Sequence, residues 1–268
     1  MVKYSGDIKI YDACAYEGMR KAGQLASDVL DYITPFVKVG VATGTLDDLM
    51  HEYIVKHGAT PAPLNYKGYP KATCISINHV ICHGIPSQER KLKADDILNI
   101  DTTVILDGWH GDTSRMYYVN ENKTPIKAKR LVQATYECLW KGIEAVKPGN
   151  TFGDIGHAIE SHAKTYRYGV VRDFVGHGIG ENFHEAPNVF HYGEPKTGAV
   201  LEEGMVFTIE PMINIGKPDM KILADGWTAV TRDRTLSAQM EHTLGVTKDG
   251  YEIFTSSKLN FSKPPYKG

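Results

Sequence analysis

The sequence predicts an α+β fold built from two similar halves that are related by a pseudo-twofold axis. Three observations support this prediction. The chain matches itself at an offset of 109 residues, each copy starts with two amphipathic helical stripes, and each copy continues into apolar strands that carry acidic residues. Such halves would join their strands into a central antiparallel sheet with the helices outside. We expect one domain over residues 1–268, with halves at about 11–121 and 122–253 and a C-terminal surface tail at 256–268.

Each copy begins with two predicted helices. Apolar residues recur at the spacing of a single helix face. In the first stripe the matched positions are Ala22, Leu25, Val29 and Leu30 in one copy and Leu131, Ala134, Cys138 and Leu139 in the other. The second stripe spans residues 46–54 and 155–163.

The start of the second helix differs between the copies. Thr151 with Asp154 three residues later is a helix-start signature, because each side chain can satisfy a backbone N–H of the first turn. The first copy has Ala42 at the matching position, and we therefore expect Thr43 or Thr45 to cap the helix there.

A turn and a buried strand follow the helices. Residues 92–101 match residues 201–210, and each segment is predicted to be a strand that ends in a carboxylate, Asp101 or Glu210. Gly58–Pro70 is rich in glycine, proline and tyrosine, which predicts a loop near these strand ends.

A second strand is predicted at 111–119 in the first copy and at 240–246 in the second. Each begins with an acidic residue, Asp112 or Glu241. The spacing from the first acidic residue to the second is 11 residues in one copy and 31 in the other. The second copy therefore carries about twenty additional residues, including Trp227, which we expect to form a long hairpin or loop.

The composition argues against a nucleic-acid-binding, membrane-spanning or secreted protein. The chain is 42% hydrophobic and 23% charged with a formal net charge of -2, so nothing indicates nucleic-acid binding. The apolar runs are too short for a membrane span, and the N-terminus lacks the apolar core of a signal peptide. The four cysteines form no CxxC motif, and we expect them to be reduced in the cytoplasm: Cys14, Cys74, Cys82 and Cys138.

The acidic residues and one histidine predict a metal site. Asp101, Asp112, Glu210 and Glu241, with His177 in a glycine-rich segment, form a mixed oxygen and nitrogen ligand set suited to two divalent ions. The repeat makes Asp112 and Glu241 the expected bridging ligands, while Asp101 and Glu210 would each bind mainly one ion. Two such ions would share a water and lower its pKa towards neutrality.

Alternatives exist for each residue taken alone. Asp101 and Asp112 are also common as turn or cap residues, and Glu210 before Pro211 could be an edge-strand charge. His83 and His184 could donate hydrogen bonds to a substrate or an oxyanion, or could be structural. The metal-site prediction therefore rests on the whole set.

Seven motifs in this order resemble those of type I methionine aminopeptidases, a branch of metallopeptidase family M24. The resemblance runs from about Tyr11 to Ile253. The motifs are Cys82–Pro86, Asn99–Asp101, Gly111–Thr113, Gly176–Gly180, Phe183–Pro187, Thr208–Pro211 and Glu241–Thr243. The resemblance implies the pita-bread fold of creatinase and the aminopeptidases, and removal of the initiator methionine by water activated at a dinuclear metal centre.

The resemblance also implies residue roles. Asp101, Asp112, His177, Glu210 and Glu241 would hold two metal ions, which in the family are cobalt, manganese, iron or zinc. His83 would contact the substrate, His184 would stabilise the tetrahedral intermediate, and Glu210 would shuttle a proton. The methionine pocket would be lined by Tyr66, Tyr69, Cys74, Phe183 and Trp227. A monovalent cation would bind near Asn78, Val80 and Ser237.

The implied substrates are nascent polypeptides that begin with methionine and carry a small second residue, which would place a monomeric enzyme near the ribosome. Two other hypotheses remain. An Xaa-Pro aminopeptidase or prolidase would share the five ligands but usually carries an extra N-terminal domain, for which we expect no room here. A metal-free binding module on this fold would typically have lost ligands, and all five are present.

Overall fold

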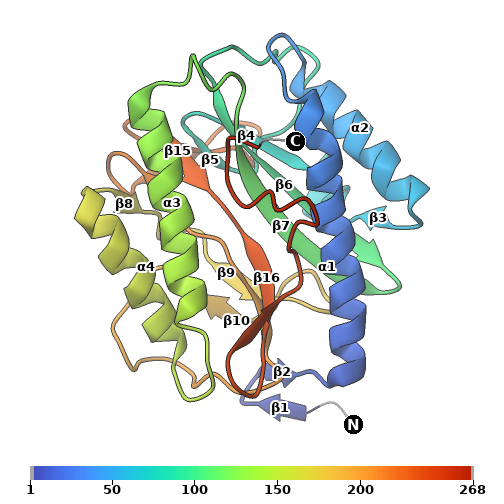
Figure 1. Ribbon diagram of the computed structural model, residues 1–268, viewed down its shortest axis with the longest axis vertical. Coiled ribbons are helices and arrows are strands. Elements are labelled where there is room, and N and C mark those ends of the chain that lie inside the picture. Colours follow the sequence, from blue (N-terminus) through green and yellow to red (C-terminus); the bar gives the residue numbers. More distant parts are fainter. Residues whose placement is uncertain (1–2, 267–268) are drawn as a thin grey trace.

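The computed structural model describes residues 3–266, which form a mixed helix and sheet structure (Figure 1). The helices are α1 (Ala13–Ile33), α2 (Thr43–Lys56), α3 (Ile126–Glu144) and α4 (Phe152–Tyr166), with 3-10 turns at Thr34–Phe36 and Tyr66–Gly68. The strands of the N-terminal part are β1 (Lys3–Ser5), β2 (Ile8–Ile10), β3 (Thr60–Pro61), β4 (Cys74–Ile77), β5 (Val80–Cys82), β6 (Ile97–Leu106) and β7 (Trp109–Tyr118). The later strands are β8 (Gly169–Val170), β9 (Gly176–Gly178), β10 (Glu185–Val189), β11 (Val206–Ile209), β12 (Met212–Asn214), β13 (Met220–Ile222), β14 (Ala229–Thr231), β15 (Ser237–Gln239), β16 (His242–Val246) and β17 (Tyr251–Ile253).

The antiparallel sheets of the two halves meet at the centre of the molecule. In the first half β6 pairs with β7 over ten residues, and β3 and β4 pair along its other edge. In the second half the strand order is β10-β9-β11-β16-β17. A bridge between Ser114 and Glu241 joins the two sheets. Three smaller sheets, β15-β12-β8, β13-β14-β5 and β1-β2, complete the sheet structure of the described residues.

Figure 1 shows the helices as two pairs, α1 with α2 and α3 with α4, that cover the same side of the strands. Each pair buries its apolar stripe in a hydrophobic core of its own. Leu30 and Leu46 belong to the core beneath α1 and α2, and Leu131 and Ile155 belong to the core beneath α3 and α4. All four side chains are fully buried. The predicted α+β architecture of two halves with outer helices is thus confirmed.

The cap prediction was right for α4 and wrong for α2. The Thr151 side chain accepts from the Asp154 N–H and the Asp154 side chain accepts from the Thr151 N–H, a complete capping box. In α2 the N-cap is Ala42, without a side-chain hydrogen bond. The Thr43 hydroxyl instead donates to the Ser87 carbonyl and accepts from the Ser87 N–H, which ties the helix to a distant loop.

Strand ends also differ from the prediction in the first half. β11 stops directly before Glu210 as expected, but β6 continues five residues beyond Asp101. Pairing with β7 along the whole of β6 supports this extension. In the second half, the strand predicted at 240–246 begins two residues later, at His242, because Met240 and Glu241 lie between β15 and β16.

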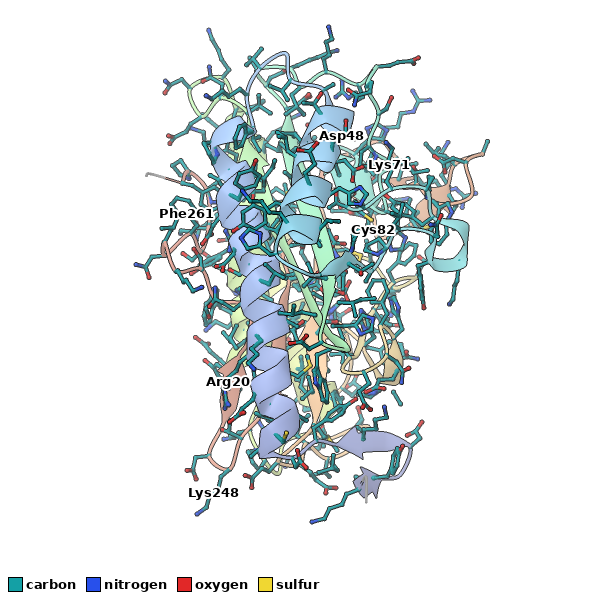
Figure 2. The ribbon with its side chains drawn as sticks, turned by 90° about the vertical axis from the view of Figure 1, so that its right-hand side faces the viewer. Arg20, Asp48, Lys71, Cys82, Lys248 and Phe261 are labelled. Carbon is teal, nitrogen blue, oxygen red and sulfur yellow. The ribbon has the colours of Figure 1, made fainter. Side chains whose placement is uncertain are left out.

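The C-terminal tail was predicted to be a surface segment; most of its described residues are exposed, and a few contacts hold it to the body. It passes between α1 and α3 in Figure 1. Ser257 donates hydrogen bonds to the Asp31 carboxylate, the Tyr266 hydroxyl donates to the Met116 carbonyl at 2.8 Å, and Phe261 is buried. Figure 2 shows Phe261 and Cys82 on opposite sides of α1.

Two expectations from the composition concern the cysteines and the lack of a membrane span. All four cysteines are free thiols, and only Cys14 is exposed. Within residues 3–266, no helix combines the length and the apolar character that a membrane crossing requires.

Candidate active site

The predicted site residues meet in a single cavity of about 1120 Å³. All five predicted metal ligands line it, as do both predicted catalytic histidines and all five residues of the predicted methionine pocket. These residues come from both halves and from segments up to 175 residues apart, between Tyr66 and Glu241. The fold thus brings together what the repeat and the motifs predicted.

The centre of the cavity is a cluster of carboxylates and one imidazole. Ligand atoms of Asp112, His177 and Glu241 all lie within 4.8 Å of one another. The His177 Nε2 atom is 3.7 Å from Asp112 Oδ2 and 3.7 Å from Glu210 Oε1, too far for a hydrogen bond to either. Asp101 on β6 lines the same space.

Two threonines fix the central carboxylate residues across the junction of the halves. The Thr113 hydroxyl donates to the Glu241 carbonyl at 2.8 Å, and the Thr243 hydroxyl donates to the Asp112 carbonyl at 2.7 Å. Each half therefore holds the backbone of the other half's acidic residue. The Thr103 hydroxyl also donates to the Asp112 carboxylate, at 2.7 Å.

Three polar residues hold Glu210. The Thr208 hydroxyl donates to Oε1 at 2.8 Å and the Gln239 side-chain amide donates to Oε2 at 3.1 Å. The Glu210 N–H donates to Nε2 of His191, also at 3.1 Å, and His191 is completely buried. Sequence reasoning missed these supports. Only Thr208 could have been found from the local sequence. It stands two residues before Glu210 in the strand predicted at 201–210, and residues two apart on a strand share a face.

Burial makes the carboxylate cluster costly without a cation. It raises the pKa of Asp112 to about 7, and burial with the nearby Asp112 charge raises that of Glu210 to about 8. For Asp101 and Glu241, burial and the neighbouring carboxylates raise the pKa well above the usual range. With these pKa values, the four acids would all be charged together only if a nearby cation offset their burial and mutual repulsion.

The donor set fits divalent metal ions. Asp101 Oδ1 is buried and has no hydrogen-bond partner among the described residues, so it is free to bind a cation. Burial lowers the pKa of His177 to about 4, which keeps the imidazole neutral as a metal ligand must be. Carboxylate oxygens with one imidazole nitrogen suit a hydrolytic metal centre.

Aromatic rings surround one side of the cluster. Tyr66 lies 4.9 Å from Phe183 and Tyr69 lies 5.1 Å from Trp227, measured between ring centroids. The Cys74 thiol is buried beside them, and burial together with the Asp101 charge raises its pKa well above 9.0, so it remains uncharged. The predicted pocket is therefore apolar apart from its tyrosine hydroxyls.

The two predicted catalytic histidines flank the cluster. The His184 ring lies 4.1 Å from the His177 ring, and His83 lies 6.1 Å from Trp227. Burial lowers the pKa of His83 to about 4 and that of His184 to about 3, with nearby His177 adding to the latter shift. Both rings are therefore neutral at pH 7, and each carries one N–H that can donate.

The residues predicted to bind a monovalent cation lie together but do not line the cavity. The Ser237 N–H donates to the Asn78 carbonyl at 2.8 Å, and Val80 is two residues further along the chain. The Asn78 side chain is occupied by Asp96 and by the backbone of Ile97. The Ser237 hydroxyl is buried without a partner among residues 3–266, which is consistent with a ligand there.

The fold and the cluster together define a metal-dependent hydrolase. Residues 17–248 match the model of metallopeptidase family M24. The methionine aminopeptidase of Rickettsia prowazekii is 57% identical over 260 residues, which cover 97% of this chain and 99% of the relative. The chain belongs to metallopeptidase family M24, in its methionine aminopeptidase branch.

Solved structures agree with this assignment. The crystal structure of the Rickettsia prowazekii methionine aminopeptidase superposes with a TM-score of 0.91 at 58% identity, covering 92% of this chain and 99% of that one. The prolidase from Pyrococcus horikoshii superposes with a TM-score of 0.74 at 22% identity, covering 93% of this chain and 64% of that one. The second likeness shows the shared pita-bread fold alone.

Proposed function

We propose that this protein is a methionyl aminopeptidase that removes the initiator methionine from new polypeptides. The convergence of five candidate metal ligands with an aromatic pocket in one cavity carries this proposal. The high identity to methionine aminopeptidases over nearly the whole chain supports it, whereas the prolidase likeness is confined to the fold.

Asp101, Asp112, His177, Glu210 and Glu241 would hold two divalent ions. When bound, these ions supply a Lewis acid and lower the pKa of water towards neutrality. Cobalt, manganese, iron and zinc are all compatible with this ligand set, and a monovalent cation near Ser237 would be separate from it. The equivalent places of Asp112 and Glu241 in the two halves favour bridging roles for both.

The residues of the chain then bind the substrate and move a proton. The methionine side chain would lie among Tyr66, Tyr69, Phe183 and Trp227, because a thioether packs favourably against aromatic rings. Neutral His83 and His184 would each donate a ring N–H, His83 to the substrate and His184 to the oxygen of the scissile carbonyl.

Glu210 is the candidate proton shuttle. Its raised pKa suits proton transfer near neutrality, at the carboxylate oxygens that Thr208 and Gln239 orient. Glu210 would accept a proton from the attacking water and return it to the leaving amine. A preference for small second residues, work near the ribosome, a monomeric state and a cytoplasmic location are further expectations for this enzyme.

Peptide turnover tests the proposal directly. Purified protein loaded with manganese, cobalt, iron or zinc should release methionine from Met-Ala-Ser and much less from Met-Leu-Ser, and it should leave Ala-Pro intact. Cleavage of Ala-Pro without release of methionine would instead identify a proline-directed enzyme. Absence of bound metal, with no thermal shift on adding manganese, would identify a binding module.

A matched pair of variants tests the site. His177→Ala removes the nitrogen ligand and should abolish turnover and weaken metal binding. His157→Ala changes an exposed histidine on α4 and should do neither. Full metal-dependent turnover by His177→Ala would refute the assignment of this centre.

A further inference from the structure

The cavity is larger than a methionine pocket needs. Ligand pockets for drug-sized molecules measure about 300–1000 Å³, and one methionine with its peptide bond is smaller than such a molecule. The lining of this cavity of about 1120 Å³ extends beyond the metal ligands and the predicted methionine pocket. We call the part lined by Asp7, Ile8, Phe152, Phe190, Tyr192 and Ala199 the distal arm.

Strand β10 connects the catalytic region to the distal arm. It begins directly after His184 and ends directly before Phe190. Four consecutive residues, from Glu185 to Asn188, line the cavity. The register of β10 with β9 shifts between Glu185 and Asn188, so side chains do not alternate regularly there, and the cavity follows the strand from His184 to Phe190. Five strand residues span at most about 17 Å, at roughly 3.3 Å each.

The edge of β10 that faces away from β9 is free of strand partners among residues 3–266. β10 is the terminal strand of its five-stranded sheet and pairs only with β9. Pro187, which lacks an N–H, is typical of an edge strand. β2 lies nearby, where Lys9 Nζ is 3.0 Å from Glu185 Oε2, but β2 pairs with β1 alone. The cavity therefore gives access to backbone groups that can bind another extended chain.

A second segment of the distal-arm lining is held in place by backbone hydrogen bonds. The loop over residues 190–199 packs on the first turn of α4, where the Phe152 N–H donates to the Ala199 carbonyl at 3.1 Å and the Gly153 N–H donates to the Thr197 carbonyl at 2.9 Å. A Cβ at Gly153 would lie 2.3 Å from the Thr197 hydroxyl, so the approach is close. At the far end Phe190 is 43% exposed and offers an apolar surface.

We propose that the free edge of β10 binds the downstream part of the substrate polypeptide as an added β-strand. This inference rests on the proposed function, because an aminopeptidase substrate must continue as a chain beyond the cleaved bond. The length of β10 accommodates about five residues, roughly positions 3–7 of the substrate. Backbone pairing is independent of side-chain identity, which suits an enzyme that acts on many different N-termini.

Substrate length provides the first test. The kcat/KM for the heptapeptide Met-Ala-Ser-Ala-Thr-Ala-Ser should exceed that for Met-Ala-Ser by about tenfold, the equivalent of about 1.4 kcal/mol, as expected for one or two net backbone hydrogen bonds. Changing the side chains at positions 3–7 should alter this ratio little. Equal kcat/KM for the two peptides would overturn the inference, whereas failure to cleave either would overturn the proposed function.

Backbone N-methylation separates strand pairing from other modes of binding. In an added strand alternate N–H groups face the partner. One heptapeptide series carries N-methyl groups at positions 4 and 6, and the other carries them at positions 5 and 7. The gain in kcat/KM over the tripeptide should be lost in one series and kept in the other. Equal effects of the two series would refute strand pairing. A dependence on side chains rather than on N–H groups would also refute it.

Two adjacent substitutions locate the binding edge. Ala199→Trp places a large ring in the distal arm. The kcat/KM for the heptapeptide, divided by that for the tripeptide, should then fall to near one. Val200→Trp makes the same change at the next exposed residue, which does not line the cavity, and should preserve the ratio. Thermal unfolding of both variants checks that they fold. An unchanged ratio in folded Ala199→Trp would exclude this path for the substrate.

Discussion

Removing the metal should make the stability of this enzyme fall as pH rises. Glu210 has its pKa raised from 4.5 to about 8 by burial and by the Asp112 charge. A raised carboxyl pKa means that the folded state holds the proton more tightly than the unfolded chain. Its stabilising contribution is complete below about pH 4.5 and is lost as pH rises through about 8.

The shift sets the size of the effect. One pKa unit corresponds to about 1.36 kcal/mol, so the Glu210 shift corresponds to at most about 5 kcal/mol of unfolding free energy. The four carboxylates titrate together, and this loss belongs to the cluster rather than to one residue. Glu210→Gln removes one of the charges. At pH 9 the metal-free variant should therefore be more stable than the metal-free wild type by several kcal/mol.

Denaturant unfolding of chelator-treated protein at pH 5, 7 and 9 measures these differences. Below pH 5 the wild type should be as stable as Glu210→Gln or more so, because its carboxyl is protonated and retains its hydrogen bonds. Glu89→Gln, at an exposed position, should follow the wild type at every pH. A wild-type unfolding free energy that stays constant or rises from pH 5 to 9 would refute the reasoning. Saturating metal should remove most of the pH dependence.

Two further substitutions test the support around the centre. His191→Leu removes the acceptor for the Glu210 N–H, and metal affinity measured by calorimetry should fall about 10- to 100-fold, whereas His191→Gln, which keeps an acceptor, should lose less. Equal losses would show that only packing matters there. Gly178→Ala would place a Cβ 2.0 Å from the Ala186 carbonyl oxygen, so metal-free protein should lose about 1–3 kcal/mol of unfolding free energy, unlike Gly250→Ala, where nothing lies within 4 Å.

The four candidate carboxylate ligands could be predicted from sequence because each belongs to a repeated local pattern, whereas His177 was recognised by its glycine-rich segment. Asp101 and Glu210 occupy matching places at the ends of matching apolar segments. The hydrogen bonds that hold these ligands could not be predicted in the same way. His191 is 19 residues from Glu210 and Gln239 is 29 residues away, and no periodicity connects them.

Local signals also failed where a distant segment supplied the partner. Thr43 is a good capping residue, yet its hydroxyl bonds to the backbone of Ser87, 44 residues away. A tertiary hydrogen bond therefore overrode the capping preference that was recognised in the sequence. Asp101 was predicted to end its strand, but pairing within the β6–β7 hairpin continues the strand to Leu106.

The departures from twofold symmetry would account for the proposed specificity of the site. The additional residues of the second half form β13 and β14, and β14 pairs with β5 of the first half, with Ala229 opposite Cys82. This pairing places Trp227 within 5.1 Å of Tyr69 and 6.1 Å of His83. The repeated elements thus supply the two pairs of carboxylates, whereas an element present in one half closes the predicted methionine pocket. Shortening the β13–β14 hairpin should therefore weaken recognition of methionine while leaving metal binding intact, a separation that peptide kinetics and calorimetry can measure independently.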